Sequence, residues 1–470
     1  MSNLHAKSEK GAGAVVIFLL VVLAAICTVL AFKVASRQGP TILLPKPLKG
    51  LGQRTELFVS AKDAKHNLKT LSVEVVQDGQ VIHQSSLVIS ARPHRWWKFW
   101  SEGPVSATTW RVLVGHEVAP ALKEGRATVR ITARNDSWGR FFRGGQSQVA
   151  LDLPVRYAAP EIEVLTSQHY INQGGCDMAV FKVSSGTTES GVQVGDNFFP
   201  SFPLKDSDPE TRLCIFAYPY NVDPSTVAHI VAHDDAGNET LASFNYKVFP
   251  KKFHSDTIDL DKTLGGKFLE NVVPPIMSQT PELQDQGSLI KNFLLINGSL
   301  RREDAQKLEA LSQRTAPKLL WKGPFVRLPG KTEAGFADYR TYIYGGQVVD
   351  HQTHLGFDLA GSEHMPVRAA NDGTVVFAGY LGIFGNAVVI DHGCGIQSLY
   401  GHLSYIAVKE GDAVKREQEI GRTGQTGLAG GDHLHFTMLL DGIPVNPVEW
   451  WDPHWIHDRI EVKMEQFSSQ

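Results

Sequence analysis

Three histidine-containing segments decide the fold and the chemistry expected of this sequence: HLGFDLA at His354–Ala360, LYGHL at Leu399–Leu403 and GDHLHF at Gly431–Phe436. Gly356 lies between His354 and Asp358, so this pair is expected where a strand runs into a turn rather than on one face of a helix. In the segment HLH, His433 and His435 point to the same side, because side chains alternate along a strand. These groups can meet at one divalent metal if the chain folds back as a small antiparallel sheet.

The donor set predicts a catalytic metal site. His354, Asp358 and His435 supply two nitrogens and one oxygen, which leaves the fourth position of a tetrahedral zinc ion to water. A structural zinc site favours four protein ligands, usually with cysteine, and this region has a single cysteine without a CxxC motif. His402 and His433 are candidates for moving a proton and stabilising an oxyanion. A single histidine on a strand is weak evidence for a metal site, so the prediction depends on all five residues occurring together.

From about Tyr342 to Pro447 the sequence resembles the lysostaphin-type (LytM-type) zinc metallopeptidases, which hydrolyse peptide cross-links in bacterial peptidoglycan. The resemblance rests on the three segments above and on further motifs in the same order: PVRAANDGTVVFAG at 366–379, GNAVVIDHG at 385–393, EGDAVKREQEIG at 410–421 and PVNP at 444–447. One departure is KREQ at 415–418, where KxGQ is more usual. It falls in a turn, so the chemistry should not be affected.

The resemblance implies the role of each site residue. The HxxxD residues and the second histidine of HxH hold one zinc ion per chain, which assigns His354, Asp358 and His435 as ligands. The first histidine of HxH and that of YxHL are catalytic, which assigns His433 and His402. One of them takes the proton of the attacking water while the other steadies the oxyanion, and the sequence does not separate their roles.

The implied function is a membrane-anchored zinc endopeptidase acting on peptidoglycan stem peptides. The main alternative is a non-enzymatic activator or scaffold for other wall hydrolases, although relatives of that kind lack ligands that are present here. A biotinyl-like carrier would explain EGDAV at 410–414 but needs no metal residues, and a tethered adhesion module leaves all five site residues unexplained. The sequence does not give the bond cleaved, an autoinhibited state, a cell-envelope protein partner or the oligomeric state.

An uncharged apolar run at 11–32 has the length of one transmembrane helix. A cleaved signal peptide is the competing interpretation, but the run is longer than a usual signal core and no A-x-A site follows it. A lipidated Cys27 is a third, which Ile26 disfavours. Flanking charges do not fix the orientation. Because peptidoglycan lies outside the cytoplasmic membrane, the chain is expected in the inner membrane, single-pass, with its catalytic domain in the periplasm.

The fold expected is mainly β, with two immunoglobulin-like sandwiches, a helical connector and an antiparallel peptidase domain, as strand alternation and a change to helical spacing indicate. The 470 residues divide as 1–10 cytoplasmic tail, 11–32 transmembrane anchor, 33–54 linker, 55–157 and 158–252 β-sandwiches, 253–324 helical connector, 325–455 peptidase domain and 456–470 C-terminal tail. In the connector, TPEL at 280–283 predicts a helix start, and a second helix is expected at 303–312.

The remaining features leave alternatives open. A net charge of −3 gives no indication of a nucleic-acid partner. Aromatic and basic loops at 92–100 and 138–145 fit packing, a membrane interface or a partner. Cys176 and Cys214 either pair or remain buried thiols. The glycine- and tyrosine-rich segment 331–349 is a candidate specificity loop or lid over the groove.

Overall fold

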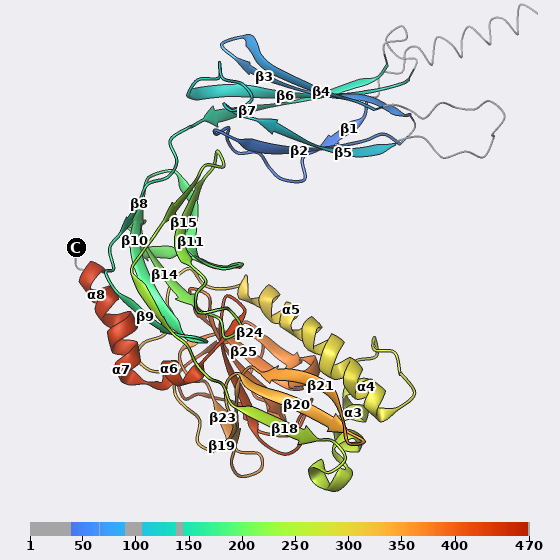
Figure 1. Cartoon of the computed structure of the whole chain (residues 1–470), viewed down its shortest axis with the longest axis vertical. Coiled ribbons are helices and arrows are strands. Elements are labelled where there is room, and N and C mark those ends of the chain that lie inside the picture. Colours follow the sequence, from blue (N-terminus) through green and yellow to red (C-terminus); the bar gives the residue numbers. More distant parts are fainter. Residues whose placement is uncertain (1–38, 65, 90–105, 138–143, 469–470) are drawn as a thin grey trace, which may run out of the picture. The chain divides into compact units, whose positions relative to one another are not determined.

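The computed structural model describes residues 39–64, 66–89, 106–137 and 144–468 (Figure 1). The expected cytoplasmic tail and transmembrane anchor, the aromatic loop at 92–100 and most of the loop at 138–145 lie outside these residues. Within the described part of the chain, no helix has both the length and the apolar character needed to cross a bilayer. The chain forms two compact units, one of residues up to Ala159 with Asp234–Glu239, the other of Pro160–His233 and Thr240 onward.

The first unit is a sandwich of two antiparallel sheets. One has the order β1-β2-β5 and the other β4-β3-β6-β7. Buried and accessible residues alternate along the long strands, so every second side chain enters the core. The immunoglobulin-like assignment stays a prediction. The strands are β1 (Thr41–Leu43), β2 (Thr55–Lys62), β3 (Leu68–Gln77), β4 (Gln80–Val88), β5 (Ala107–Val114), β6 (Gly125–Asn135) and β7 (Gln146–Val155).

The second unit begins with another pair of sheets, β13-β14-β10-β8 and β12-β11-β15-β16, beside a parallel pair β17-β9. Cys176 and Cys214 are buried free thiols on neighbouring strands, and Cys214 lies opposite Ala179, so the two do not pair here. The strands are β8 (Ile162–Val164), β9 (His169–Asn172), β10 (Cys176–Val183), β11 (Thr187–Val194), β12 (Asn197–Pro200), β13 (Phe202–Lys205), β14 (Asp208–Ala217), β15 (Ala228–Asp234), β16 (Glu239–Ala242) and β17 (Tyr246–Phe249).

The connector contains helices, but the predicted helix start at Thr280 is wrong. Thr280 instead ends a helix, because its N–H and hydroxyl both bond the carbonyl of Ile276. Ser288 caps the next helix with its hydroxyl. The elements are strand β18 (Ser255–Asp259), a 3₁₀ turn η1 (Thr263–Gly266), α3 (Phe268–Gln279), α4 (Leu289–Leu295), a π-helical turn η2 (Ile296–Leu300) and α5 (Arg301–Ser312).

The peptidase region is built on an antiparallel sheet of order β19-β22-β30-β26-β25-β24-β28, with β31 beside β30. β26 and β30 are buried along their whole length, which places them in the middle of the core. The strands are β19 (Lys331–Ala334), β22 (Phe357–Ala360), β24 (Gly373–Tyr380), β25 (Asn386–Gly393), β26 (Ile396–Leu403), β28 (Ala413–Val414), β30 (Leu434–Leu440) and β31 (Ile443–Val445), with a 3₁₀ turn η3 (Gly382–Phe384).

Two smaller sheets flank it, β23-β29-β27 and β18-β20-β21. The second sheet contains a parallel pair, because β18 lies along β20 in the same direction. Segment 331–349, expected as a loop or lid, therefore consists largely of paired strands. The strands are β20 (Asp338–Tyr344), β21 (Gln347–His354), β23 (Pro366–Arg368), β27 (Tyr405–Ile406) and β29 (Glu419–Arg422).

The chain ends in short helices, and the predicted tail at 456–470 is helical as far as Ser468. These helices pack against β10 (Figure 1). The buried Lys463 Nζ lies 2.5 Å from Asp177 Oδ1 of that strand. Helix α5 contacts η3 of the peptidase region. The C-terminal elements are α6 (Pro447–Trp451), α7 (Pro453–Ile456), a π-helical turn η4 (His457–Glu461) and α8 (Val462–Ser468).

Candidate metal centre

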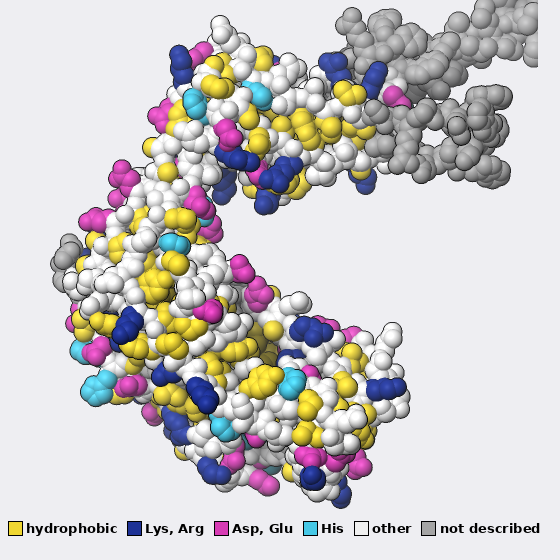
Figure 2. Space-filling view, in the orientation of Figure 1, with side chains coloured by type: hydrophobic (Ala, Val, Ile, Leu, Met, Phe, Trp, Pro, Cys, Tyr) yellow, Lys and Arg dark blue, Asp and Glu magenta, His cyan; other side chains and the backbone are white. Residues whose placement is uncertain are grey.

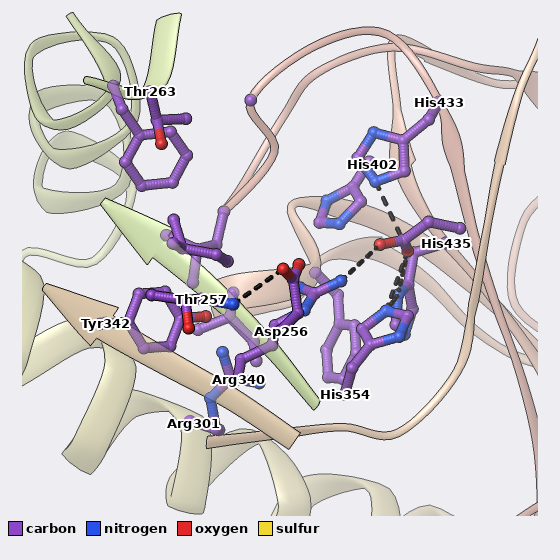
Figure 3. Close-up of a pocket in the computed structure, with 17 residues that line it drawn as sticks. Asp256, Thr257, Thr263, Arg301, Arg340, Tyr342, His354, His402, His433 and His435 are labelled. Atoms are coloured by element: carbon purple, nitrogen blue, oxygen red, sulfur yellow. Dashed lines mark hydrogen bonds and ion pairs between the residues drawn. The ribbon is translucent and has the colours of Figure 1, made fainter. Parts of the chain in front are cut away.

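Strand register brings the three expected ligands together. Asp358 on β22 is the cross-strand partner of His435 on β30, so their side chains start from adjacent positions. His354 ends β21, and the turn that follows returns the chain into β22. The three residues are between 5% and 8% exposed. Figure 3 shows the imidazoles of His354 and His435 converging beside those of His402 and His433.

The three donor atoms form a tight cluster. Asp358 Oδ1 lies 3.0 Å from His354 Nε2 and 2.9 Å from His435 Nδ1, and the two nitrogens are 3.1 Å apart. Neighbouring ligand atoms of a tetrahedral zinc ion are about 3.3 Å apart when the metal–ligand bonds are about 2.0 Å. The separations here are close to that value.

Hydrogen bonds on the far side of each ring fix where the lone pairs point. His354 Nδ1 donates to the carbonyl of Gly335 at 2.8 Å, so its Nε2 carries the lone pair. Thr437 donates its hydroxyl to the carbonyl of Leu355 at 3.0 Å and accepts from His435 Nε2 at 3.0 Å. The cluster therefore consists of three electron-pair donors facing one another, which is the arrangement that a cation stabilises. The residues present fit a zinc ion.

Gly356 leaves the space that the His435 ring occupies. A Cβ at Gly356 would lie 2.6 Å from His435 Cε1 and Nε2 and from Thr437 Oγ1. Any larger residue would displace the ligand ring or its hydroxyl acceptor. The glycine between His354 and Asp358 is thus required by close approach to β30.

The electrostatics of the cluster favour an ionised Asp358 carboxylate. Burial alone would raise the pKa of Asp358, but the neighbouring imidazoles, His354 first, hold it well below its usual range. Burial lowers the pKa of His435 to about 4, although Asp358 opposes this effect. Arg340 supports the same carboxylate, with Nη2 at 3.1 Å from Asp358 Oδ2.

His402 reaches the cluster from a bulge in β26. Asn386 pairs with Leu403 and Val388 with Tyr400, so two residues of β26 face the single residue Ala387. His402 has a φ of +63°, a left-handed conformation that is uncommon outside glycine. Its Nδ1 donates to the carbonyl of Thr426 at 2.8 Å, which leaves Nε2 as a proton acceptor. Burial and the neighbouring His433 lower the pKa of His402 well below its usual value.

His433 stands next to His402, with ring centroids 4.8 Å apart. Its Nδ1 donates to the carbonyl of Gly431 at 2.8 Å, and its Nε2 is 3.5 Å from Asp358 Oδ1. Burial would lower the pKa of His433, but the hydrogen bond and charge of Asp358 raise it. The structure thus brings together all five residues singled out in the sequence.

A cavity of about 280 Å³ opens over this cluster. Its walls come from β18, the start of α3, α5 and β20 as well as from the histidine-bearing strands. The cavity is large enough for part of an extended peptide to lie beside the cluster.

Comparison with known proteins decides the assignment of this region. Residues 352–447 match the family model described as Peptidase family M23. The chain contains a peptidase family M23 domain. This confirms the predicted resemblance to the lysostaphin-type peptidases at the level of the domain.

Relatives of the M23 domain include the DD-carboxypeptidase/endopeptidase Mpg of Neisseria meningitidis, 45% identical over 20% of this chain and 22% of that protein. The peptidoglycan DD-endopeptidase ShyA of Vibrio cholerae is 31% identical over 36% of this chain and 37% of that protein. The chain thus spans about a fifth to two fifths of the length of these relatives. The solved catalytic domain of lysostaphin from Staphylococcus simulans is 26% identical, with 31% of this chain and 94% of that chain covered and a TM-score of 0.20.

Three residues that contact the cluster or line its cavity were not predicted from the sequence. Thr437 was accessible to the reasoning used for His433 and His435, because it is the next residue on the same side of β30. Arg340 and Arg301 lie outside the matched segment, and no sequence pattern connects either of them to the cluster. They are found only from the fold.

Proposed function

We propose that this chain is a membrane-anchored zinc endopeptidase that hydrolyses peptide cross-links of bacterial peptidoglycan. The observation that carries the proposal is the convergence of two imidazole lone pairs and one carboxylate, with His402 and His433 beside them. Relatives named peptidoglycan DD-endopeptidases support the substrate class. Over the face in Figure 2, cationic and anionic side chains of the described residues are interspersed, which is not typical of a nucleic-acid surface.

His354, Asp358 and His435 would hold the zinc ion, and Arg340 would orient the carboxylate. When bound, zinc supplies Lewis-acid polarisation of the scissile carbonyl and acidifies water. His402 and His433 each have Nδ1 tied to a backbone carbonyl, so each ring is held in one orientation with Nε2 available. One of these Nε2 atoms takes the proton of the attacking water and then passes it to the leaving amine, and the other ring, in its protonated form, donates from Nε2 to the developing oxyanion.

Digestion of purified peptidoglycan by the zinc-loaded chain, with the fragments identified by mass, tests the activity. His402→Ala is expected to keep zinc and lose at least a hundredfold in rate, because its Nε2 moves a proton and binds no metal. Asp358→Ala is expected to lose zinc and activity together. Zinc content is measured in parallel by metal analysis. Wild-type turnover by His402→Ala would refute its catalytic role, and a zinc-loaded wild type without turnover would favour a non-enzymatic activator.

The location proposed is the inner membrane, with the apolar run 11–32 as a single span and the M23 domain in the periplasm. This orientation follows from the substrate. Reporter fusions placed after Gln38 should be active only for the reporter that requires export. Activity of the cytoplasmic reporter instead would overturn the orientation.

A further inference from the structure

The cavity over the metal centre has a cationic wall that the hydrolytic chemistry does not use. Arg301, the first residue of α5, and Arg340 of β20 both line it, on the side away from His402 and His433 (Figure 3). A group bound by these arginines would lie next to the candidate ligand Asp358, because Arg340 also bonds the Asp358 carboxylate.

Arg340 retains capacity for a ligand. Its bond to Asp358 Oδ2 at 3.1 Å uses one of the five N–H donors of a guanidinium. Its side chain is 21% exposed. An arginine stays protonated, and the bond to Asp358 holds this cation in a fixed place.

Arg301 is a half-buried cation that forms no direct ion pair among the described residues. It donates to the backbone carbonyl and the side-chain oxygen of Asn297, at 3.3 and 2.6 Å. Among the residues that the structure describes, no carboxylate lies within 4 Å of its guanidinium. Burial lowers its pKa and the charge of Arg340 adds to this effect, whereas Tyr342 and the carboxylates of Asp350 and Asp304 oppose it, and an arginine stays protonated. A positive charge removed from water without a directly bonded counterion is unfavourable, so this position suits an anionic ligand.

Asp256 reduces the net positive charge on this side of the cavity. It is the register partner of Arg340 in the parallel pair β18-β20, and its side chain lines the same cavity. Its only hydrogen bond among the described residues is from the N–H of the following Thr257. An exposed carboxylate in this place is a competitor for any carboxylate that a ligand brings.

We infer that Arg301 and Arg340 bind a free carboxylate of the peptide substrate next to the scissile bond, so that peptides bearing this carboxylate are preferred over the same peptides with a carboxamide. The inference rests on the proposed function, since it names the substrate group read by the same cavity. A guanidinium matches a carboxylate with two parallel hydrogen bonds, and a neutral amide cannot replace that charge-assisted contact.

The test uses two labelled synthetic stem peptides that differ only in a free carboxylate or a carboxamide at that position. Their dissociation constants are measured on the full-length, zinc-loaded His402→Ala chain, whose turnover is expected to be slow enough for binding to be measured first. We expect the acid to bind on the order of tenfold more tightly than the amide. Arg301→Gln should reduce this ratio to within about twofold, and Arg301→Lys should keep an intermediate ratio because a point charge remains.

Two further variants sharpen the result. Arg302→Gln removes the next arginine of α5, which is exposed and bonds Ser299, so the ratio should stay at its parent value. Asp256→Asn should raise the ratio by removing the competing carboxylate. An acid preference that is equal in the parent and in Arg301→Gln, or that falls equally in Arg302→Gln, would overturn the inference. Absence of cleavage by the zinc-loaded wild-type chain, together with an intact Arg301-dependent ratio, would refute the proposed endopeptidase and leave the carboxylate site standing.

Discussion

The convergence of the candidate metal ligands was predictable residue by residue because their chemistry depends on side-chain type. Imidazole and carboxylate groups at His354, Asp358 and His435 have few other uses in such a pattern, and the structure brings them within 3.1 Å of one another. The groups that orient them were less accessible. Gly335 and Thr426 contribute backbone carbonyls, which every residue possesses, so no sequence signal distinguishes them.

Thr437 gives the sharpest prediction at the residue scale. Its hydroxyl accepts from His435 Nε2, so Thr437→Val should leave that N–H without an acceptor in a buried place. Partners of this kind typically contribute tenfold to a hundredfold in metal affinity. We expect zinc affinity to fall by about that factor, as measured by competition with a chromophoric chelator.

Thr437→Ser is the matched control, because it keeps the hydroxyl while removing a methyl group. It should retain zinc within a few-fold of the wild type. Equal zinc affinity of the valine and serine variants would show that the hydroxyl does not orient His435.

At the scale of elements, periodicity identified strands better than helix ends. The long β-strands alternate as expected, whereas Thr280-Pro281 looked like a helix start and proved to follow a helix end. Helix α3 lies in the predicted helical connector but was not predicted as an element of its own, and it contains Pro274 and Pro275, which usually break helices. The bulge that aims His402 was equally hidden, since it depends on how β25 and β26 are paired.

The turn between β30 and β31 contains a carboxyl group whose ionisation should make the stability of the fold depend on pH. Asp441 and Gly442 have φ values of +49° and +82°, as in a type I′ turn. The Asp441 carboxyl is largely buried, and its Oδ2 has no hydrogen bond among the described residues. Burial raises its pKa to about 7. Between the unfolded value of 3.8 and about 7, the folded chain binds more protons than the unfolded chain, so stability decreases as pH rises.

Asp441→Asn should remove this loss while keeping a residue that suits the turn. A shift of about three pKa units corresponds to at most about 4 kcal/mol. We therefore expect the variant to gain about 2–4 kcal/mol over the wild type at pH 8 and little at pH 4, measured by urea unfolding. Glu449, whose pKa burial also raises to about 7, is common to both proteins and cancels in the difference. A pH-independent difference between them would contradict the assignment.

At the scale of the whole molecule, the sequence indicated successive β regions but not what joins them. Residues 456–470 were expected to be a tail, yet the helices there pack on β10 of the preceding sheets. Glu449 makes a second long-range contact, because its carboxylate accepts hydrogen bonds from the side chain of Asn172 and the N–H of Cys176 at 2.8 Å each. These contacts span more than 270 positions along the chain, a separation at which local patterns carry no information.

The buried pair of Lys463 and Asp177 is the contact on which this joint should depend most. Lys463 Nζ also donates to the carbonyl of Met178 at 2.8 Å, and Asp177 is fully buried. Lys463→Met leaves the buried carboxylate without its cation, and removal of one partner of such a pair costs about 3–5 kcal/mol. We expect a loss of that size by denaturant unfolding, whereas Lys331→Met, which breaks an exposed pair with Glu333, should stay within about 1 kcal/mol of the wild type.

The double variant Asp177→Asn with Lys463→Met should recover part of the loss, because no uncompensated charge then remains. If it were no more stable than Lys463→Met alone, the penalty would arise from lost packing of α8 rather than from the unpaired charge.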